Sequence, residues 1–213
     1  MQASQNIIDC YNKTAKNYAD KFIDELAGKH LDRILLNAFA QENAGKGKMI
    51  DLGGGPGQTT KFLSNAGVSN IVGTDLSPGM VSLAKSIHPG LHFEVADMLQ
   101  LPYPDQSFAS AIAFYAIVHF SYEQVLLAFR EIKRVLTGAG QFLFSFHVGN
   151  DKRHFDQFLE HEVNIDFYFF ETQQIKALLL QAGFSIIDIL ERQPYPAEHP
   201  STRAYIWVSA GKI

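Results

Sequence analysis

The stretch Asp51-Leu52-Gly53-Gly54-Gly55-Pro56-Gly57 decides the fold of this chain. Its first two residues end a short run over residues 48–52 that predicts a buried strand, and a predicted helix over residues 59–65 follows it. Glycines allow the backbone a positive φ and let a ligand approach it closely. The free N–H groups at the start of the following helix favour a negative group nearby. We therefore expect a ligand-binding turn between a strand and a helix.

Beyond this turn, strand and helix signals alternate along the chain. The pair Ser77-Pro78 is typical of a helix start, and Ser121 with Gln124 has the spacing of a capping box. Such alternation predicts an α/β fold with a mostly parallel sheet, helices on both faces and ligands at the carboxyl ends of the strands. The last two strands have a connection too short for a crossover helix, so they should be antiparallel. Further strands are expected over residues 70–75, 91–96, 108–114, 141–146, 184–190 and 204–209.

The chain is expected to form a single domain that opens with two helices. One apolar face of the second helix is marked by Leu31, Ile34, Leu35, Ala38 and Phe39. A polar and aromatic stretch after the fifth strand interrupts the alternation, and it is a candidate substrate lid. The four expected parts are an N-terminal helical cap (1–45), a cofactor-binding core (46–148), an insertion (149–171) and a C-terminal helix with a strand pair (172–213).

Composition and charge narrow the function. The chain has 213 residues, of which 46% are hydrophobic, so it can bury a core without disulfides. Its single cysteine, Cys10, can form no internal disulfide and cannot build a metal site alone. The formal net charge is -4 and the basic residues are scattered, which argues against nucleic acid as a partner. The sequence has no signal-peptide layout and no run long enough to span a bilayer, so we expect a cytoplasmic protein without membrane partners. Nothing in it indicates the oligomeric state.

Two cofactors could explain the glycine turn. The dinucleotide fingerprint G-x-G-x-x-G, counted from Gly53, needs a third glycine where this chain has Gln58. The pattern D-x-G-x-G-x-G from Asp51 to Gly57 instead resembles motif I of the class I S-adenosylmethionine-dependent methyltransferases. The resemblance implies a Rossmann-like, seven-stranded sheet and S-adenosylmethionine as cofactor. The turn would hold it through Asp51, Gly53, Gly55 and Gly57.

Further cofactor contacts are expected at the ends of the next two strands. Asp75 ends the second strand, where a carboxylate can accept hydrogen bonds from both ribose hydroxyls. The resemblance places an acidic residue, here Asp97, beside the adenine amino group, with Met98 next to the ring. The apolar side chains expected around the adenine ring could equally be residues of the hydrophobic core. The expected apolar contacts are Leu76, Met80 and Phe114.

The resemblance covers nearly the whole chain, including residues 101–108 and 130–136. At the front, Tyr11-Asn12-Lys13-Thr14-Ala15-Lys16-Asn17-Tyr18 is similar to the Y-D-x-x-A-x-x-Y opening of many bacterial small-molecule methyltransferases, with Asn in place of the common Asp. In that group the opening helix covers the cofactor, which implies that Tyr11 and Tyr18 lie near its methionine end. Their spacing puts both on one helical face, as a plain core stripe would also do.

The expected reaction is methyl transfer to a small molecule. Such a displacement demands alignment and exclusion of water, and it needs no metal. A hydroxyl or amine acceptor requires a base, and His119 and His147, which follow the fourth and fifth strands, are the candidates. Each could equally be a structural histidine. Two alternatives stay open: a nicotinamide-dependent oxidoreductase, against which Gln58 argues, and a non-catalytic protein that binds S-adenosylmethionine.

Overall fold

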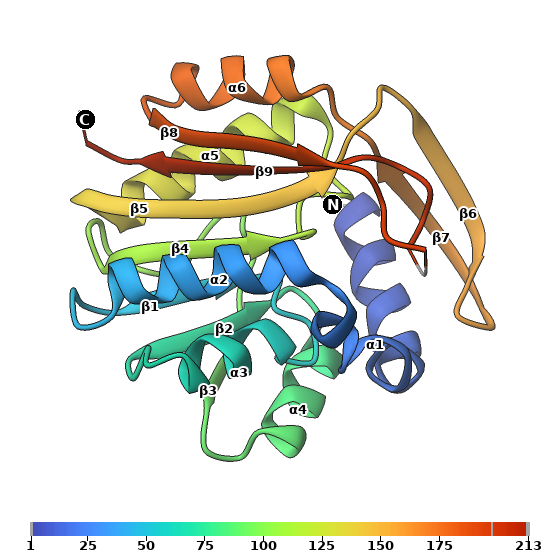
Figure 1. Cartoon of the computed structure of the whole chain (residues 1–213). Helices are drawn as coiled ribbons and strands as arrows, with labels where there is room; N and C mark the ends of the chain where they lie inside the picture. The colour runs from blue at the N-terminus through green and yellow to red at the C-terminus, as the bar shows by residue number, and fades with distance from the viewer. Residues whose placement is uncertain (1, 197, 212–213) are drawn as a thin grey trace.

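The computed structural model describes residues 2–196 and 198–211. Its main feature is a seven-stranded sheet in the order β3-β2-β1-β4-β5-β9-β8 (Figure 1). The pairs from β3 to β5 are parallel, whereas β9 is antiparallel to β5 and to β8. This confirms the predicted α/β fold with an antiparallel C-terminal strand. The strands are β1 (Met49–Leu52), β2 (Ile71–Asp75), β3 (His92–Val95), β4 (Phe108–Phe114), β5 (Leu136–His147), β8 (Ser185–Arg192) and β9 (Arg203–Ser209).

Helices cover both faces of this sheet, with α2 and α3 on one face and α5 and α6 on the other (Figure 1). Helix α1 lies at the carboxyl ends of the parallel strands, against α4. The predicted caps are present: the Ser77 side chain accepts from Met80 N, and Ser121 forms a capping box with Gln124. Among the described residues, no helix is long and apolar enough to cross a membrane. The helices are α1 (Gln2–Phe22), the 3-10 helix η1 (Glu25–Gly28), α2 (His30–Asn43), α3 (Gln58–Asn65), α4 (Pro78–Ile87), α5 (Tyr122–Val135) and α6 (Thr172–Gln181).

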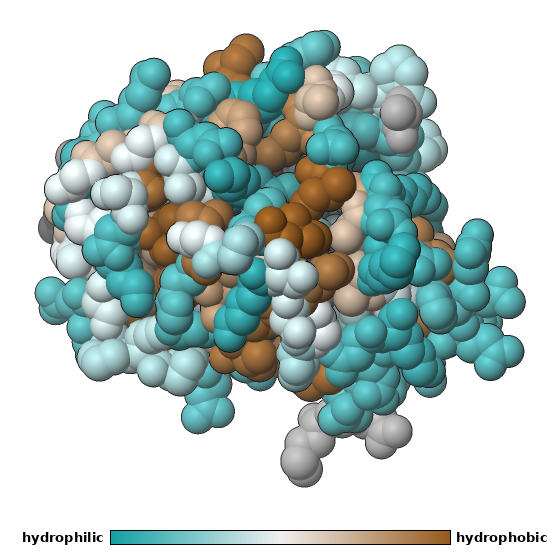
Figure 2. Space-filling model, turned by 90° about the horizontal axis from the view of Figure 1, so that it is seen from below, coloured by the Kyte–Doolittle hydropathy of each residue, from teal (hydrophilic) through white to brown (hydrophobic). Residues whose placement is uncertain are grey.

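The central strands are apolar on both sides because both faces are covered. On β5, Phe142 and Phe144 belong to the core beneath α5 and α6, whereas Leu143 between them belongs to the core beneath α2 and α3. The rings of Phe142 and Phe144 stack with 4.8 Å between centroids. On the face of the molecule seen in Figure 2, hydrophobic residues gather near the centre and hydrophilic ones surround them. The double-sided core gives the strand ends, where ligands bind, a rigid base.

The buried face of α2 is rotated relative to the predicted one. Leu35 and Phe39 are buried as expected, but Ile34 is 62% exposed and Ala38 is exposed too. The cause is a buried polar residue. Asp32 is fully buried in a hydrogen-bonded network, so the face of α2 that carries Asp32 turns toward the core. Within the expected N-terminal cap, α2 packs on the sheet and α1 covers the strand ends. The buried residues of α2 are Asp32, Leu35, Leu36, Phe39, Ala40 and Asn43.

The insertion forms a separate β-hairpin of β6 (Lys152–Phe158) and β7 (His161–Tyr168). Its turn residues Leu159 and Glu160 have φ of 48° and 67°, the left-handed region that two-residue hairpin turns require. Asn-Gly or Asp-Gly usually fills such turns, so the sequence carried no hairpin signal there. The signal that was available is the alternation of Val163, Ile165 and Phe167 along the second strand.

Candidate functional site

The glycine turn adopts backbone angles that favour glycine, since Gly53, Gly55 and Gly57 have φ of 65°, 52° and 91°. A Cβ on Gly53 would lie 2.5 Å from the Cβ of Ala116. A Cβ on Gly55 would meet only the Tyr18 ring, at 3.8 Å, and would otherwise point into open space. Gly53 and Gly55 therefore expose their backbone to a cavity, whereas Gly57 caps α3 and does not line it.

Asp75, at the end of β2, holds the turn and faces the cavity. Its carboxylate accepts hydrogen bonds from the backbone N–H groups of Gly55 (3.0 Å) and Ser77 (2.8 Å). Burial raises the pKa of Asp75, and these hydrogen bonds partly oppose the rise. Each carboxylate oxygen has a second lone pair, so both can still accept from another donor.

Asp51 supports the turn from beneath. It is 1% exposed and accepts a 2.6 Å hydrogen bond from Thr60 Oγ1. Burial raises the pKa of Asp51 to about 7, although the Thr60 hydrogen bond lowers it in part. A Cβ on Gly54 would lie 3.1 Å from the Asp51 carboxylate. This close approach explains why a glycine stands at this point of the turn. Asp51 does not line the cavity, so the structure places it in support of the turn.

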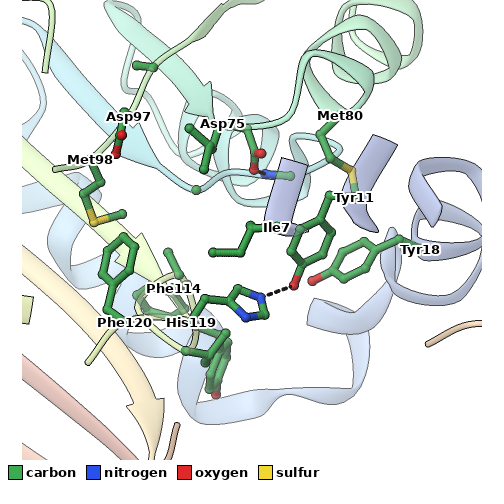
Figure 3. A pocket seen from close by; sticks show the side chains of 17 residues that line it. Ile7, Tyr11, Tyr18, Asp75, Met80, Asp97, Met98, Phe114, His119 and Phe120 are labelled. Carbon is green, nitrogen blue, oxygen red and sulfur yellow. Dashed lines mark hydrogen bonds between the residues drawn. The ribbon is translucent and has the colours of Figure 1, made fainter. Parts of the chain in front are cut away.

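The cavity lies at the carboxyl ends of the parallel strands, has a volume of about 100 Å³ and is partly open to solvent. In Figure 3, Asp97, Met98 and Phe120 lie at one end of the cavity, and Tyr11 and Tyr18 at the other. The sequence-predicted cofactor residues that line it are Tyr11, Tyr18, Gly53, Gly55, Asp75, Leu76, Met80, Asp97, Met98 and Phe114.

Several lining residues were missed by the sequence analysis. Most of them directly follow β4, so the rule that ligands bind at carboxyl strand ends could have found them. Ile7 is different: it comes from α1, and nothing in the sequence distinguishes it from other apolar residues of that helix. The missed residues are Ile7, Ala96, Tyr115, Ala116, Val118 and Phe120.

A histidine and a tyrosine meet where α1 closes the cavity (Figure 3). His119 Nε2 lies 2.8 Å from the Tyr11 hydroxyl, and His119 Nδ1 lies 2.7 Å from the backbone oxygen of Asp166 in β7. Because a carbonyl oxygen only accepts, Nδ1 carries the proton, and Tyr11 donates to the unprotonated Nε2. Burial lowers the pKa of His119 to about 4, so the ring is neutral at physiological pH. The hairpin thereby fixes the tautomer of His119.

His147, the other base candidate, does not line this cavity. Its Nδ1 lies 2.9 Å from Ser201 Oγ, and its ring packs against Tyr115 and Phe169 at centroid distances of 5.3 and 5.7 Å. Burial lowers the pKa of His147 to about 3. The structure therefore brings His119, but not His147, to the predicted cofactor residues.

Two asparagines fasten α1 over the cavity. The Asn12 side-chain oxygen accepts from Ser77 Oγ (2.8 Å) and from Gly79 N (2.7 Å) at the start of α4. Asn17 donates to the backbone oxygen of Leu159 at the tip of the hairpin. An amide oxygen accepts as a carboxylate would, so the asparagine that departs from the resembled opening motif still anchors the helix.

A buried ion-pair network lies next to the cavity wall and joins it through Tyr115. The Tyr115 hydroxyl lies 3.0 Å from the Asp32 carboxylate, which also accepts from Tyr205 (2.7 Å) and Arg192 (3.1 Å). Arg192 donates two further hydrogen bonds to Glu198, at 2.6 and 2.9 Å. The residues of this network come from segments far apart in the chain, so no short sequence motif could have predicted it.

Comparison with known families and sequences points to one kind of protein. Residues 50–144 match the family model described as methyltransferase domain. An uncharacterized methyltransferase, YcgJ of Bacillus subtilis (strain 168), is 30% identical over 156 residues, which is 71% of this chain and 59% of that protein. The probable tRNA methyltransferase 9B of Bos taurus is 31% identical over 72% of this chain and 32% of its own length. Trans-aconitate 2-methyltransferase of Methylobacterium nodulans is 39% identical over 43% of this chain and 36% of its own length. This chain thus spans 32 to 59% of the length of these relatives.

Solved structures share the fold at low sequence identity. The magnesium protoporphyrin IX methyltransferase ChlM of Synechocystis PCC 6803, solved with bound S-adenosylmethionine, has a TM-score of 0.73 at 16% identity, over 98% of this chain and 97% of that one. The YcgJ structure from Bacillus has a TM-score of 0.67 at 19% identity, over 86% of this chain and 100% of that one. At such identities the likeness establishes the fold alone.

Proposed function

Because the chain contains a class I S-adenosylmethionine-dependent methyltransferase domain, we propose that it transfers the methyl group of that cofactor to a small-molecule acceptor. The observation that carries the proposal is one cavity with a carboxylate pair at one side and a neutral histidine at the other. Asp75 and Asp97 are the carboxylates, and His119 is the histidine. The cytoplasmic location expected from the sequence stays a prediction.

The lining of the cavity fits a cationic cofactor. Asp75 and Asp97 are its acidic residues, and no lysine or arginine is among the described residues that line it. S-adenosylmethionine carries a positive charge and no phosphate, whereas the diphosphate of a nicotinamide cofactor would find carboxylates and no cation in this lining. The open space at Gly55 also fits, because a side chain there would fill the cavity. These features favour S-adenosylmethionine over NAD.

When bound, S-adenosylmethionine supplies a methyl group on a positively charged sulfur, ready for in-line displacement. The residues of the chain bind and orient it. Asp75 has acceptor capacity for ribose hydroxyls, and Asp97 for the adenine amino group. Met80 is buried in the cavity wall, and Met98 and Phe114 offer further apolar surface. Tyr11 and Tyr18, brought by α1, exclude water from the opposite end.

His119 is positioned to take a proton from the acceptor. Its Nδ1 proton is held by the Asp166 carbonyl, which leaves Nε2 free of a proton and directed at the cavity. General base catalysis of this kind contributes roughly 10²–10⁴-fold to a rate. The hairpin that supplies the carbonyl also contacts α1, so we assign it the role of a lid over the acceptor. His147 has no part in this scheme.

A small molecule is favoured over nucleic acid as acceptor, although several relatives are named as tRNA methyltransferases. Proteins that bind RNA neutralise phosphates with lysine and arginine. The described lining of this cavity has neither, and the chain carries a formal charge of -4. The acceptor therefore has to be recognised by shape and hydrogen bonding.

Calorimetric titration with S-adenosylhomocysteine, with NAD in parallel, tests the proposal. We expect binding of S-adenosylhomocysteine in the micromolar range (about 8 kcal/mol) and no binding of NAD. Binding of NAD alone would refute the cofactor assignment. A screen of acceptors with labelled cofactor would then test the acceptor class, and methylation of tRNA but of no small molecule would refute that part.

A further inference from the structure

Aromatic rings gather around His119: Tyr11 and Tyr18 line the cavity, whereas Phe158 and Phe167 of the hairpin pack against these rings without lining it. The Tyr11 ring lies edge-on to Tyr18, His119 and Phe158, at centroid distances of 5.9, 5.4 and 6.2 Å. From β7, Phe167 packs against the His119 ring at 4.6 Å and against Phe158 at 5.7 Å. Edge-to-face packing of this kind suits a further flat ring.

The described lining of the cavity contains no lysine or arginine, so it offers no cationic partner to an acceptor near His119. Asp75 and Asp97 are at the ends of β2 and β3, and in Figure 3 they stand across the cavity from His119. An acceptor with a carboxylate or phosphate near His119 would be buried without a cationic partner, which is costly. The geometry therefore favours an uncharged acceptor.

The hydrogen bond from Tyr11 to His119 indicates which chemical group of an acceptor would bind to the histidine. Its phenol hydroxyl donates to His119 Nε2, the atom that would take the proton of the acceptor. A free aromatic hydroxyl has the same ring, the same donor and the same length from ring to oxygen. A weakly basic histidine also takes a proton more readily from such an acidic hydroxyl than from an aliphatic alcohol.

Building on the methyl-transfer function above, we propose that the acceptor is an uncharged aromatic molecule with a ring hydroxyl, which replaces the Tyr11 hydroxyl on His119 Nε2. The acceptor oxygen forms its bond to the methyl carbon while the bond from that carbon to sulfur breaks, and the sulfur keeps the electron pair as a neutral thioether. The hydroxyl proton passes to Nε2, so the positive charge ends on His119. The products are an aromatic methyl ether and S-adenosylhomocysteine.

The test uses p-cresol, the tyrosine side chain as a free molecule, and two relatives of the same shape. These are p-toluate, which replaces the hydroxyl by a carboxylate, and 4-methylanisole, the methylated product. Each is titrated into the full chain saturated with S-adenosylhomocysteine, and binding is followed by calorimetry or ligand-observed NMR. We expect p-cresol to bind roughly tenfold more tightly than p-toluate, because the anion lacks a partner. It should bind roughly fivefold more tightly than 4-methylanisole, which cannot donate a hydrogen bond.

Two variants link this selectivity to the proposed atoms. Tyr11→Phe removes the competing hydroxyl, so the affinity for p-cresol should rise several-fold while that for 4-methylanisole stays unchanged. Tyr122→Phe is the matched control, because the Tyr122 hydroxyl accepts from Glu171 N outside the cavity. With S-adenosylmethionine in place of the product, mass spectrometry should detect 4-methylanisole formed from p-cresol.

The outcomes separate this inference from the function on which it rests. Binding of p-toluate as tight as that of p-cresol would overturn the inference, as would an affinity for p-cresol that Tyr11→Phe leaves unchanged. In either case normal binding of S-adenosylhomocysteine would keep the proposed function. Failure of S-adenosylhomocysteine to bind the unaltered chain would overturn both.

Discussion

Two neighbouring regions of this molecule bury carboxylates and treat them in opposite ways. In the cavity region, Asp51 is buried and accepts a hydrogen bond from a hydroxyl group. Asp75 is half-buried and accepts hydrogen bonds from backbone N–H groups. In the network region, Asp32 and Glu198 share the guanidinium of Arg192. Burial raises the pKa of Asp51 to about 7. Burial acts in the same direction on Glu198, but the hydrogen bonds from Arg192 and from Tyr195 N, together with the charges of Arg203 and Arg192, outweigh it and lower the pKa of Glu198 to about 2.

From this difference we infer that the cavity region serves the proposed binding, whereas the network region serves stability. A carboxylate whose charge is disfavoured by burial gains when a ligand brings donors or a positive charge to it. A carboxylate already paired has nothing to gain from a ligand, and it ties together the segments that carry it. Removing a cation should therefore damage the network most, while removing a carboxylate should affect the cavity mainly through its ligand.

The largest effect is expected from Arg192→Met. Arg192 is 9% exposed as a side chain, and its loss takes the paired cation from buried Asp32 and leaves Glu198 with the longer pairs to Lys29 (3.7 Å) and Arg203 (3.8 Å). Breaking a buried ion pair from one side costs about 3–5 kcal/mol. We expect the free energy of unfolding, measured by urea denaturation, to fall by about that amount.

The matched control for Arg192→Met is Lys16→Met. Lys16 pairs with Asp20 at 2.6 Å, but the two side chains are 81% and 63% exposed. Exposed pairs contribute only about 0–1 kcal/mol. Equal losses in both variants would mean that the network region does not hold its ion pairs away from solvent, and the contrast between the regions would disappear.

A smaller effect, of a different kind, is expected from Asp75→Ala. The variant loses the acceptor proposed for the ribose, so binding of S-adenosylhomocysteine should weaken by about 1–3 kcal/mol in calorimetry. Asp75→Asn keeps one acceptor oxygen for Gly55 or Ser77 and should lose less. Cofactor affinity that is the same in both variants and in the unaltered chain would remove Asp75 from the ribose role.

Local signals explain why so much of the fold and of the cavity could be predicted from the sequence. The glycine turn, the Ser77 and Ser121 caps and the acidic strand ends each depend on residues close together in the chain. What could not be predicted depends on distant partners. The choice between His119 and His147 required the position of the hairpin, whose turn at Leu159 lacks glycine.

The rotated face of α2 has the same origin in distant partners. Counting apolar residues at helical spacing selects Ile34, because the count gives no weight to a buried acid. Asp32 overrides that count, since an unpaired buried carboxylate costs more than an exposed isoleucine gains. Its partners Arg192 and Tyr205 lie 160 and 173 residues away in sequence. No window over α2 alone could contain them.

The smallest effect concerns the pH dependence of stability, and it follows from His119. Burial lowers its pKa from 6.5 to about 4, so between these values the unfolded chain binds a proton that the folded chain does not. Stability contributed by the neutral ring is therefore lost as the pH falls below about 6.5.

His119→Gln does not titrate, yet its amide can donate to the Asp166 carbonyl and accept from Tyr11 as the neutral histidine does. Between about pH 7 and pH 5.5, urea denaturation should show the unaltered chain losing about 1 kcal/mol relative to His119→Gln. Asp51 and His147 titrate in both proteins, so their contributions cancel in this difference. A difference that is the same at both pH values would mean that His119 is solvated in the folded chain, and the cavity region would then lack the buried neutral base on which its proposed chemistry depends.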